Sequence, residues 1–145
     1  MICTVALAGC QATYPEIDGT YIEDKAATLA YARKHFPIDS EGIKAYENGP
    51  SIMVVIDGNV LSKQFQGKSI RYEQPDSKSF EHRVRFKRVD ASTFRFRYPY
   101  DQESDAFVIL EDDGIWLTTP GKPDQRIKLK KQKNQQVDDG GGQAP

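Results

Sequence analysis

Cysteine is almost absent from this chain: of its 145 residues only Cys3 and Cys10 are cysteines, and both precede the part expected to fold. The folded part therefore has no disulfide, no Cys-x-x-Cys redox pair and no thiolate zinc site. Long apolar runs are also lacking, and none reaches the length of about eighteen residues that a membrane-spanning helix requires. Charge of one sign is not in excess, since 20 basic and 21 acidic residues give a net charge of -1. No overall field draws the chain to nucleic acid.

Catalytic signatures are absent as well. The sequence contains no Gly-x-Ser-x-Gly elbow, no His-Glu-x-x-His and no glycine-rich phosphate loop. The acidic residues Asp101, Glu103 and Asp105 alternate in a spacing suited to calcium, but the EF-hand pattern is missing and a solvated loop is the favoured interpretation. We therefore expect no enzyme, no metal site and no cofactor.

The first ten residues are uncharged and mostly apolar or small, which is typical of the end of a secretory signal peptide. The tetrapeptide Leu7-Ala8-Gly9-Cys10 resembles the lipobox of bacterial lipoproteins, in which the cysteine is acylated and becomes the first mature residue. The resemblance implies a membrane anchor on Cys10, a tether over residues 11–18, and a location in the cell envelope, at the outer membrane facing the periplasm. The alternative is a cytosolic protein whose first strand happens to end in this tetrapeptide.

A helical segment is expected early in the folded part, after a first strand at residues 19–24. Asp24 is well placed to cap a helix over residues 25–36, and Pro37 ends it. A weaker helical stretch is expected at residues 40–48 before Gly49-Pro50.

From residue 51 onward the apolar residues recur with period two, which predicts strands. The connections are too short for parallel crossovers, so the strands are antiparallel. We expect a mainly β fold, an up-and-down meander that closes into a small barrel with one N-terminal helix packed on it. The domain is expected to span residues 19–131, followed by a disordered tail at 132–145. The expected strands lie at residues 51–56, 60–66, 69–74, 80–87, 94–100, 106–111, 115–119 and 126–131, with a loop at 120–124.

The N-terminal strand carries a second resemblance. Gly19-Thr20-Tyr21, followed by a helix, a meander and a basic last strand, looks like the lipocalin-type barrels, where the aromatic residue is usually Trp. In that family a basic residue of the last strand covers the aromatic ring, which makes Arg126 the candidate to cover Tyr21. The resemblance implies a lipocalin-like barrel and no particular ligand.

Between residues 80 and 100 aromatic residues alternate with charged ones, so that one face of these strands is aromatic. We expect this face to line the barrel interior and to take a small apolar or amphipathic ligand, with His82 as a polar handle. A core His82 bonded to a neighbouring tyrosine is the other interpretation, and the favoured one. The expected pocket residues are Tyr72, Phe80, His82, Phe94, Phe96 and Tyr98.

The opposite face of the same strands is basic. Its residues are Arg83, Arg85, Lys87, Arg95 and Arg97. One interpretation is a surface that docks an acidic envelope partner, or inhibits an enzyme, as a non-enzymatic interaction module. The other is a solvated face balanced by the six acidic residues at 101–113. The sequence alone favours neither.

Trp116 lies between Ile115 and Leu117, so it points to the face opposite theirs. If these neighbours are inside the barrel, Trp116 is outside. We expect it under the helix of residues 25–36, which must bury its own apolar stripe.

Overall fold

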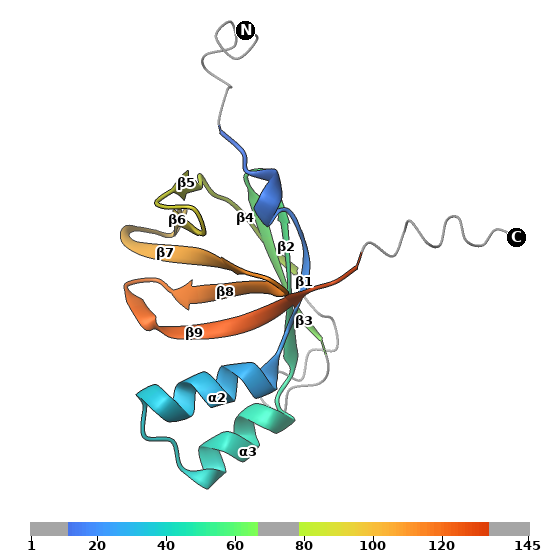
Figure 1. Ribbon diagram of the computed structural model, residues 1–145, viewed down its shortest axis with the longest axis vertical. Helices are drawn as coiled ribbons and strands as arrows, with labels where there is room; N and C mark the ends of the chain where they lie inside the picture. Colours follow the sequence, from blue (N-terminus) through green and yellow to red (C-terminus); the bar gives the residue numbers. More distant parts are fainter. Residues whose placement is uncertain (1–11, 67–78, 134–145) are drawn as a thin grey trace, which may run out of the picture.

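The computed structural model describes residues 12–66 and 79–133 (Figure 1). Its N-terminal part contains a short 3-10 helix, η1 (Pro15–Ile17), a strand, β1 (Gly19–Glu23), and two helices, α2 (Lys25–His35) and α3 (Ser40–Asn48). Each α-helix begins at an aspartate that caps it. The Oδ1 atom of Asp24 accepts a hydrogen bond from Ala27 N–H at 3.0 Å, and Asp39 bonds Gly42 N–H in the same way at 2.8 Å.

Eight further strands follow in the described residues. They are β2 (Ser51–Asp57), β3 (Val60–Gln66), β4 (Ser79–Arg83), β5 (Lys87–Arg88), β6 (Thr93–Tyr98), β7 (Asp101–Glu111), β8 (Gly114–Thr119) and β9 (Lys122–Lys131). All nine strands form one antiparallel sheet in the order β4-β3-β2-β1-β9-β8-β7-β6-β5. The prediction of a mainly β, antiparallel meander is thus confirmed.

The sheet curls into a half-barrel. Its two edge strands, β4 and β5, are at opposite ends of the strand order, yet only the three residues Val84, Arg85 and Phe86 separate them along the chain. Three residues of extended chain span about 10 Å, so the two edges of the sheet must lie close together. Figure 1 shows the strands wrapping around a common interior.

The interior holds the core. Phe94, Phe96 and Tyr98 of β6 are buried, as their alternation with arginine predicts. They pack with buried residues from other strands around the curl, including Tyr21, Val54, Ile56, Leu61, Val108, Ile115 and Leu129. At the N-terminal side Ile17 is fully buried and its carbonyl oxygen accepts the hydroxyl of Tyr21 at 2.7 Å. The segment that was expected to be a tether therefore packs on the barrel at this residue.

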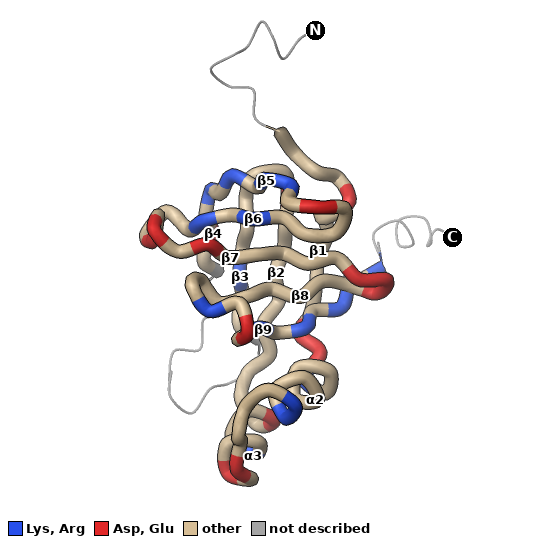
Figure 2. The backbone as a smooth tube through the Cα atoms, turned by 60° about the vertical axis from the view of Figure 1, so that its left-hand side comes forward, with Lys and Arg blue, Asp and Glu red and all other residues tan. Residues whose placement is uncertain are grey.

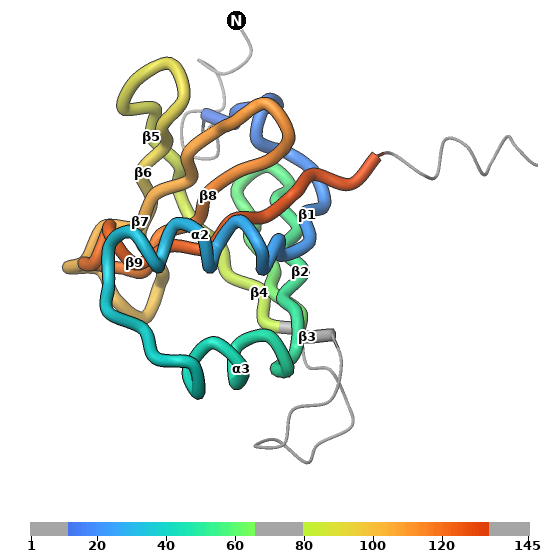
Figure 3. Tube along the Cα trace, turned by 60° about the horizontal axis from the view of Figure 1, so that its bottom comes forward, coloured from blue at the N-terminus to red at the C-terminus, as the bar shows by residue number. Residues whose placement is uncertain are grey.

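The helices cover one end of the half-barrel, and α2 packs along β9 (Figure 3). Trp116 lies beneath α2 as predicted, with its ring 5.2 Å from that of Tyr31. Lys25 at the start of α2 donates hydrogen bonds to the carbonyl oxygens of Tyr46 and Gly49 at the end of α3, at 2.8 and 2.7 Å. Neither helix of the described residues has the length and apolar character needed to span a membrane.

Three details of the prediction need correction. Residues 101–105 and 122–124 are parts of β7 and β9, not loops, because the hairpin turns beside them are tighter than expected. The strand expected at 80–87 is interrupted at residues 84–86, where the chain leaves one edge of the sheet and joins the other. The helical stretch expected at residues 40–48 is present as α3, so two helices and not one accompany the sheet. The strand expected at 69–74 lies outside the described residues.

Candidate functional site

The seam of the half-barrel is the most unusual part of the sheet. We define the seam as the gap between β4 and β6, crossed by residues 84–86. At one end Lys87 of β5 pairs with Arg95 of β6, while at the other end His82 of β4 pairs with Leu61 of β3. The chain therefore changes partner strands across the seam, and in the described residues no backbone pairing joins β4 to β6.

Aromatic side chains fill the inner side of the seam. The ring of Phe96 lies 5.2 Å from that of Phe86 and 5.1 Å from that of Tyr98. The ring of His82 lies 5.2 Å from that of Tyr98 and 5.6 Å from that of Tyr100. Side-chain packing thus replaces the missing backbone hydrogen bonds between β4 and β6. These rings pack against one another and fill the interior beside the seam.

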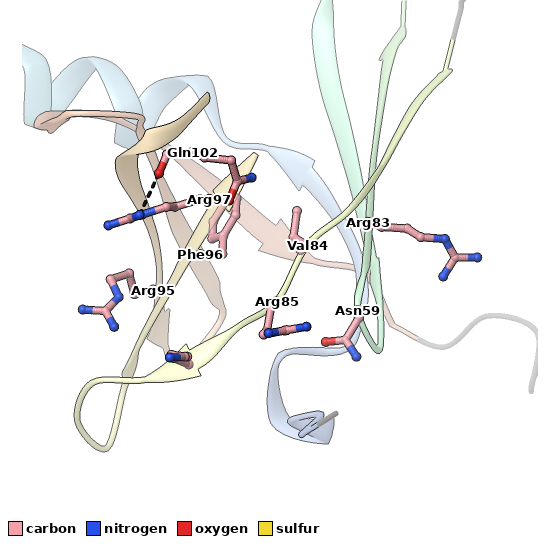
Figure 4. Close-up of a pocket in the computed structure, with 9 residues that line it drawn as sticks. Asn59, Arg83, Val84, Arg85, Arg95, Phe96, Arg97 and Gln102 are labelled. Atoms are coloured by element: carbon pink, nitrogen blue, oxygen red, sulfur yellow. Dashed lines mark hydrogen bonds between the residues drawn. The ribbon is translucent and has the colours of Figure 1, made fainter. Parts of the chain in front are cut away.

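The outer side of the seam forms a cleft of about 570 Å³. Its buried apolar residues are Val84 and Phe96 (Figure 4). The remaining lining residues are polar or basic: Asn59, Arg83, Arg85, Lys87, Arg95, Arg97 and Gln102. All five residues predicted to form the basic face thus line this one cleft. Figure 2 shows basic residues along β4, β5 and β6.

Most of these cations have no counter-ion in the part of the chain that the structure describes. Among the described residues no carboxylate lies within ion-pair distance of Arg83, Arg85, Lys87 or Arg95. Lys87 and Arg95 also lie directly opposite each other on neighbouring strands, an arrangement of like charges that destabilises a sheet. An anion bound between them would relieve this repulsion.

The acidic residues of β7 and the next turn do not balance the cleft. Asp105 pairs with Arg97 at 2.7 Å, and Arg97 also donates to the carbonyl oxygen of Gln102 at 2.7 Å. Glu111 and Asp113 instead pair with Lys128 of β9, two strands away from β7 in the sheet order. Among the described residues, an acidic side chain of the neighbouring strand therefore neutralises Arg97 alone. The other four cations of the cleft remain available to a ligand.

Asn59 closes one end of the cleft. It lies in the turn between β2 and β3, and its backbone carbonyl oxygen accepts the N–H of Val84 at 2.8 Å. This bond ties the turn to the seam. The side-chain oxygen of Asn59 is buried and has no hydrogen-bond partner among the described residues. A buried acceptor without a partner costs about 1–3 kcal/mol, so this atom favours a ligand that carries a donor group.

A further cation lies on the inner side of the seam. Lys63 of β3 is partly buried, and its ammonium nitrogen lies 4.5 Å from the ring centre of Tyr98. Burial lowers the pKa of Lys63. Burial, together with the positive charge of Lys63, also lowers the pKa of His82. Burial raises the pKa of Tyr98, so its hydroxyl stays protonated at neutral pH.

The predicted pocket residues are only partly brought together. Phe94, Phe96 and Tyr98 are buried in the core, His82 is partly buried, and Phe80 is 46% exposed at the end of the half-barrel. Tyr72 and Cys10 lie outside the described residues. The expected cover of Tyr21 by Arg126 is wrong. Arg126 lies over the ring of Tyr31, and the residue of the last strand, β9, that lies opposite Tyr21 is Lys131.

Sequence reasoning missed Asn59 and Lys63. Asn59 was assigned only to a hairpin turn, and a turn residue carries no local sign of what it faces. Lys63 did leave a signal, because it occupies an inward position of the alternating segment Leu61-Ser62-Lys63-Gln64-Phe65. A lysine at such a position is costly unless it has a use.

The described residues contain no cluster of three or more His, Cys, Asp or Glu side chains that could hold a metal ion. The groups that line the seam cleft are its cations, two amide side chains, Val84 and the ring of Phe96. A comparison of the chain with known protein families, curated proteins and solved structures finds no match.

Proposed function

We propose that this protein is a binding protein, not an enzyme, and that its seam cleft holds the anionic group of a small amphipathic molecule. The observation that carries the proposal is the set of four cations, Arg83, Arg85, Lys87 and Arg95, that line one cleft without a carboxylate partner among the described residues. Arginine side chains bind carboxylate and phosphate groups through paired, charge-assisted hydrogen bonds.

The apolar floor of the cleft favours an amphipathic molecule over a simple ion. Val84 and Phe96 are 5% and 2% exposed, and both belong to the core as well as to the cleft lining. A flexible acyl chain attached to the anion can lie over these two residues. The basic rim and apolar floor together match a headgroup and its attached chain.

A double charge reversal tests this proposal. We expect Arg85→Glu/Arg95→Glu to bind dodecyl phosphate at least about 100-fold more weakly than the wild type, since each charge-assisted hydrogen bond contributes about 1.5–3 kcal/mol. Isothermal titration calorimetry below the micelle concentration measures this. The control Lys44→Glu/Lys122→Glu makes the same change in net charge at exposed positions outside the cleft. An equal loss in both double variants would show that overall charge, not the cleft, governs binding.

The second candidate function is docking of an acidic protein, and the exposure of the cleft rim favours it. Arg83, Arg85, Lys87 and Arg97 are exposed, so a macromolecule can reach them. This function predicts that dodecyl phosphate does not bind to the wild type, whereas an acidic peptide such as oligo-glutamate binds and is lost in Arg85→Glu/Arg95→Glu. The two probes therefore separate the two functions.

We further propose that Cys10 carries a lipid anchor that holds the domain in the cell envelope, at the outer membrane facing the periplasm. The resemblance of residues 7–10 to the lipobox supports this. In a bacterial host, metabolic labelling with an alkyne fatty acid should mark the wild type and Cys3→Ser but not Cys10→Ser. Label on all three proteins, or on none, would contradict the anchor.

A further inference from the structure

Lys63 is a cation inside the half-barrel with an apolar neighbour on each side. In the sheet it lies opposite Val54 of β2 and opposite Phe80 of β4. Val54 is fully buried in the interior, so Lys63, in register with it, points to the same face. Its ammonium group lies over the ring of Tyr98. Lys63 thus has aromatic and aliphatic surroundings.

No acidic side chain of the described residues neutralises Lys63. None lies within ion-pair distance of its ammonium group. The carboxylate of Glu23, in the neighbouring row of the sheet, is already occupied, because it accepts the hydroxyl of Tyr46 and the backbone N–H of Ile52 at 3.1 Å. Among the described residues, the other titratable groups beside Lys63 are His82 and Tyr98, with Tyr100 stacked on Tyr98; none of them supplies a negative charge at neutral pH. An unpaired, partly buried charge is unfavourable for folding.

Large aromatic rings beside Lys63 are exposed. Phe65, Phe80 and Tyr100 are 38%, 46% and 68% exposed, and they make up three of the four exposed large apolar residues among those described. They form two pairs on either side of Lys63: the rings of Phe65 and Phe80 are 6.4 Å apart, and that of Tyr100 stacks on Tyr98 at 5.1 Å. Lys63 links the two pairs, because it lies opposite Phe80 in the sheet and its ammonium group lies over the ring of Tyr98. Exposed apolar surface of this kind marks a contact site.

We propose that this patch is a second binding site, separate from the seam cleft, for a ring-bearing organic anion whose negative group pairs with Lys63. The rings of Phe65, Phe80 and Tyr100 provide stacking surfaces, and His82 provides a ring nitrogen for a hydrogen bond. The unpaired charge of Lys63 favours a ligand with a negative group, and the exposed rings favour a ligand with a planar apolar ring. The site therefore suits aromatic carboxylates, sulfonates and phosphates.

The two sites lie on opposite faces of the same strand. Phe80 and His82 alternate with Arg83 along β4, so the inner rings and the outer arginines point in opposite directions. None of Lys63, Phe65, Phe80 and Tyr100 lines the seam cleft. Variants of one site can therefore be used as controls for the other.

Two fluorescent probes with similar rings test the proposal. 8-Anilinonaphthalene-1-sulfonate carries a negative charge, whereas N-phenyl-1-naphthylamine has the same rings and is neutral. We expect Lys63→Met to lower the affinity for the sulfonate at least tenfold and to leave the affinity for the neutral probe within twofold of the wild type. Lys63→Arg, which keeps the cation, should retain sulfonate binding. Arg85→Glu/Arg95→Glu should retain it as well, which separates this site from the seam cleft.

Stability measurements complete the test. Lys63→Met should unfold at a higher temperature than the wild type, because methionine removes an unpaired charge from apolar surroundings, so that a loss of sulfonate binding cannot come from unfolding. Wild-type affinity for the sulfonate in Lys63→Met would overturn the proposal. So would a loss of sulfonate binding confined to Arg85→Glu/Arg95→Glu, which would place the probe in the cleft, or a lower unfolding temperature of Lys63→Met, which would make Lys63 structural.

Discussion

Replacement of Gly114 by alanine is expected to destabilise the protein by at least about 3 kcal/mol. Gly114 begins β8 and lies opposite Lys130 of β9. A Cβ atom at this position would lie 2.0 Å from the carbonyl oxygen of Leu129 and 2.9 Å from the Cα atom of Lys130. Both are backbone atoms, so no side-chain rotation relieves the clash. The β8–β9 hairpin must shift, and with it the strand that joins β1 to the rest of the sheet.

Urea denaturation followed by circular dichroism measures this effect. Gly42→Ala is the matched control, because the added Cβ atom in α3 would meet only side-chain atoms, at 3.1 Å from Oδ1 of Asp39 and 3.5 Å from a methyl group of Ile38. Alanine is also the better helix former, so the control should change stability by less than about 1 kcal/mol. If Gly114→Ala were as stable as Gly42→Ala, the close packing of β8 on β9 would be wrong.

Truncation of Phe96 has the second large expected effect. We expect Phe96→Ala to lower the free energy of unfolding by about 3–5 kcal/mol, since the side chain is 2% exposed and large-to-small changes in a core have this cost. The ring of Phe96 packs against Phe86 of the crossing segment and against Tyr98 of its own strand. Its loss removes the ring contact that holds the crossing segment, residues 84–86, against β6.

Phe80→Ala provides the comparison, because Phe80 is also on a strand next to the seam but is 46% exposed. This variant should lose about 1 kcal/mol or less, in proportion to the smaller apolar area it buries. Chemical denaturation of both variants gives the difference directly. Equal losses in the free energy of unfolding would mean that the packing of the Phe96 ring does not hold the half-barrel together.

Much of the fold is readable from local patterns. Alternation along residues 94–98 predicts that Phe94, Phe96 and Tyr98 are buried while Arg97 is exposed, and the structure agrees. Asp24 as a helix cap follows from its position before an alanine-rich segment. These features depend on residues within a few positions of one another, and the period of a strand or the start of a helix is a local property.

Strand lengths were harder to predict. The alternating acidic residues Asp101, Glu103 and Asp105 read as a loop, yet they belong to β7, whose charged side chains lie along an exposed part of the sheet. Polar composition is typical of loops and also of solvated strand faces. The sequence by itself does not separate the two, because the choice depends on whether a partner strand is present.

By itself the sequence determined the antiparallel meander, the inward aromatic face and the outward basic face, because each follows from the two-residue period of a strand. Only the tertiary structure decided that the chain changes partner strands at residues 84–86. It also decided that Lys63 lies over Tyr98 and that five basic residues line one cleft, namely Arg83, Arg85, Lys87, Arg95 and Arg97. These features depend on which strands become the edges of the sheet and on how far it curls. Both are set by contacts between residues distant in the chain, which no local pattern encodes.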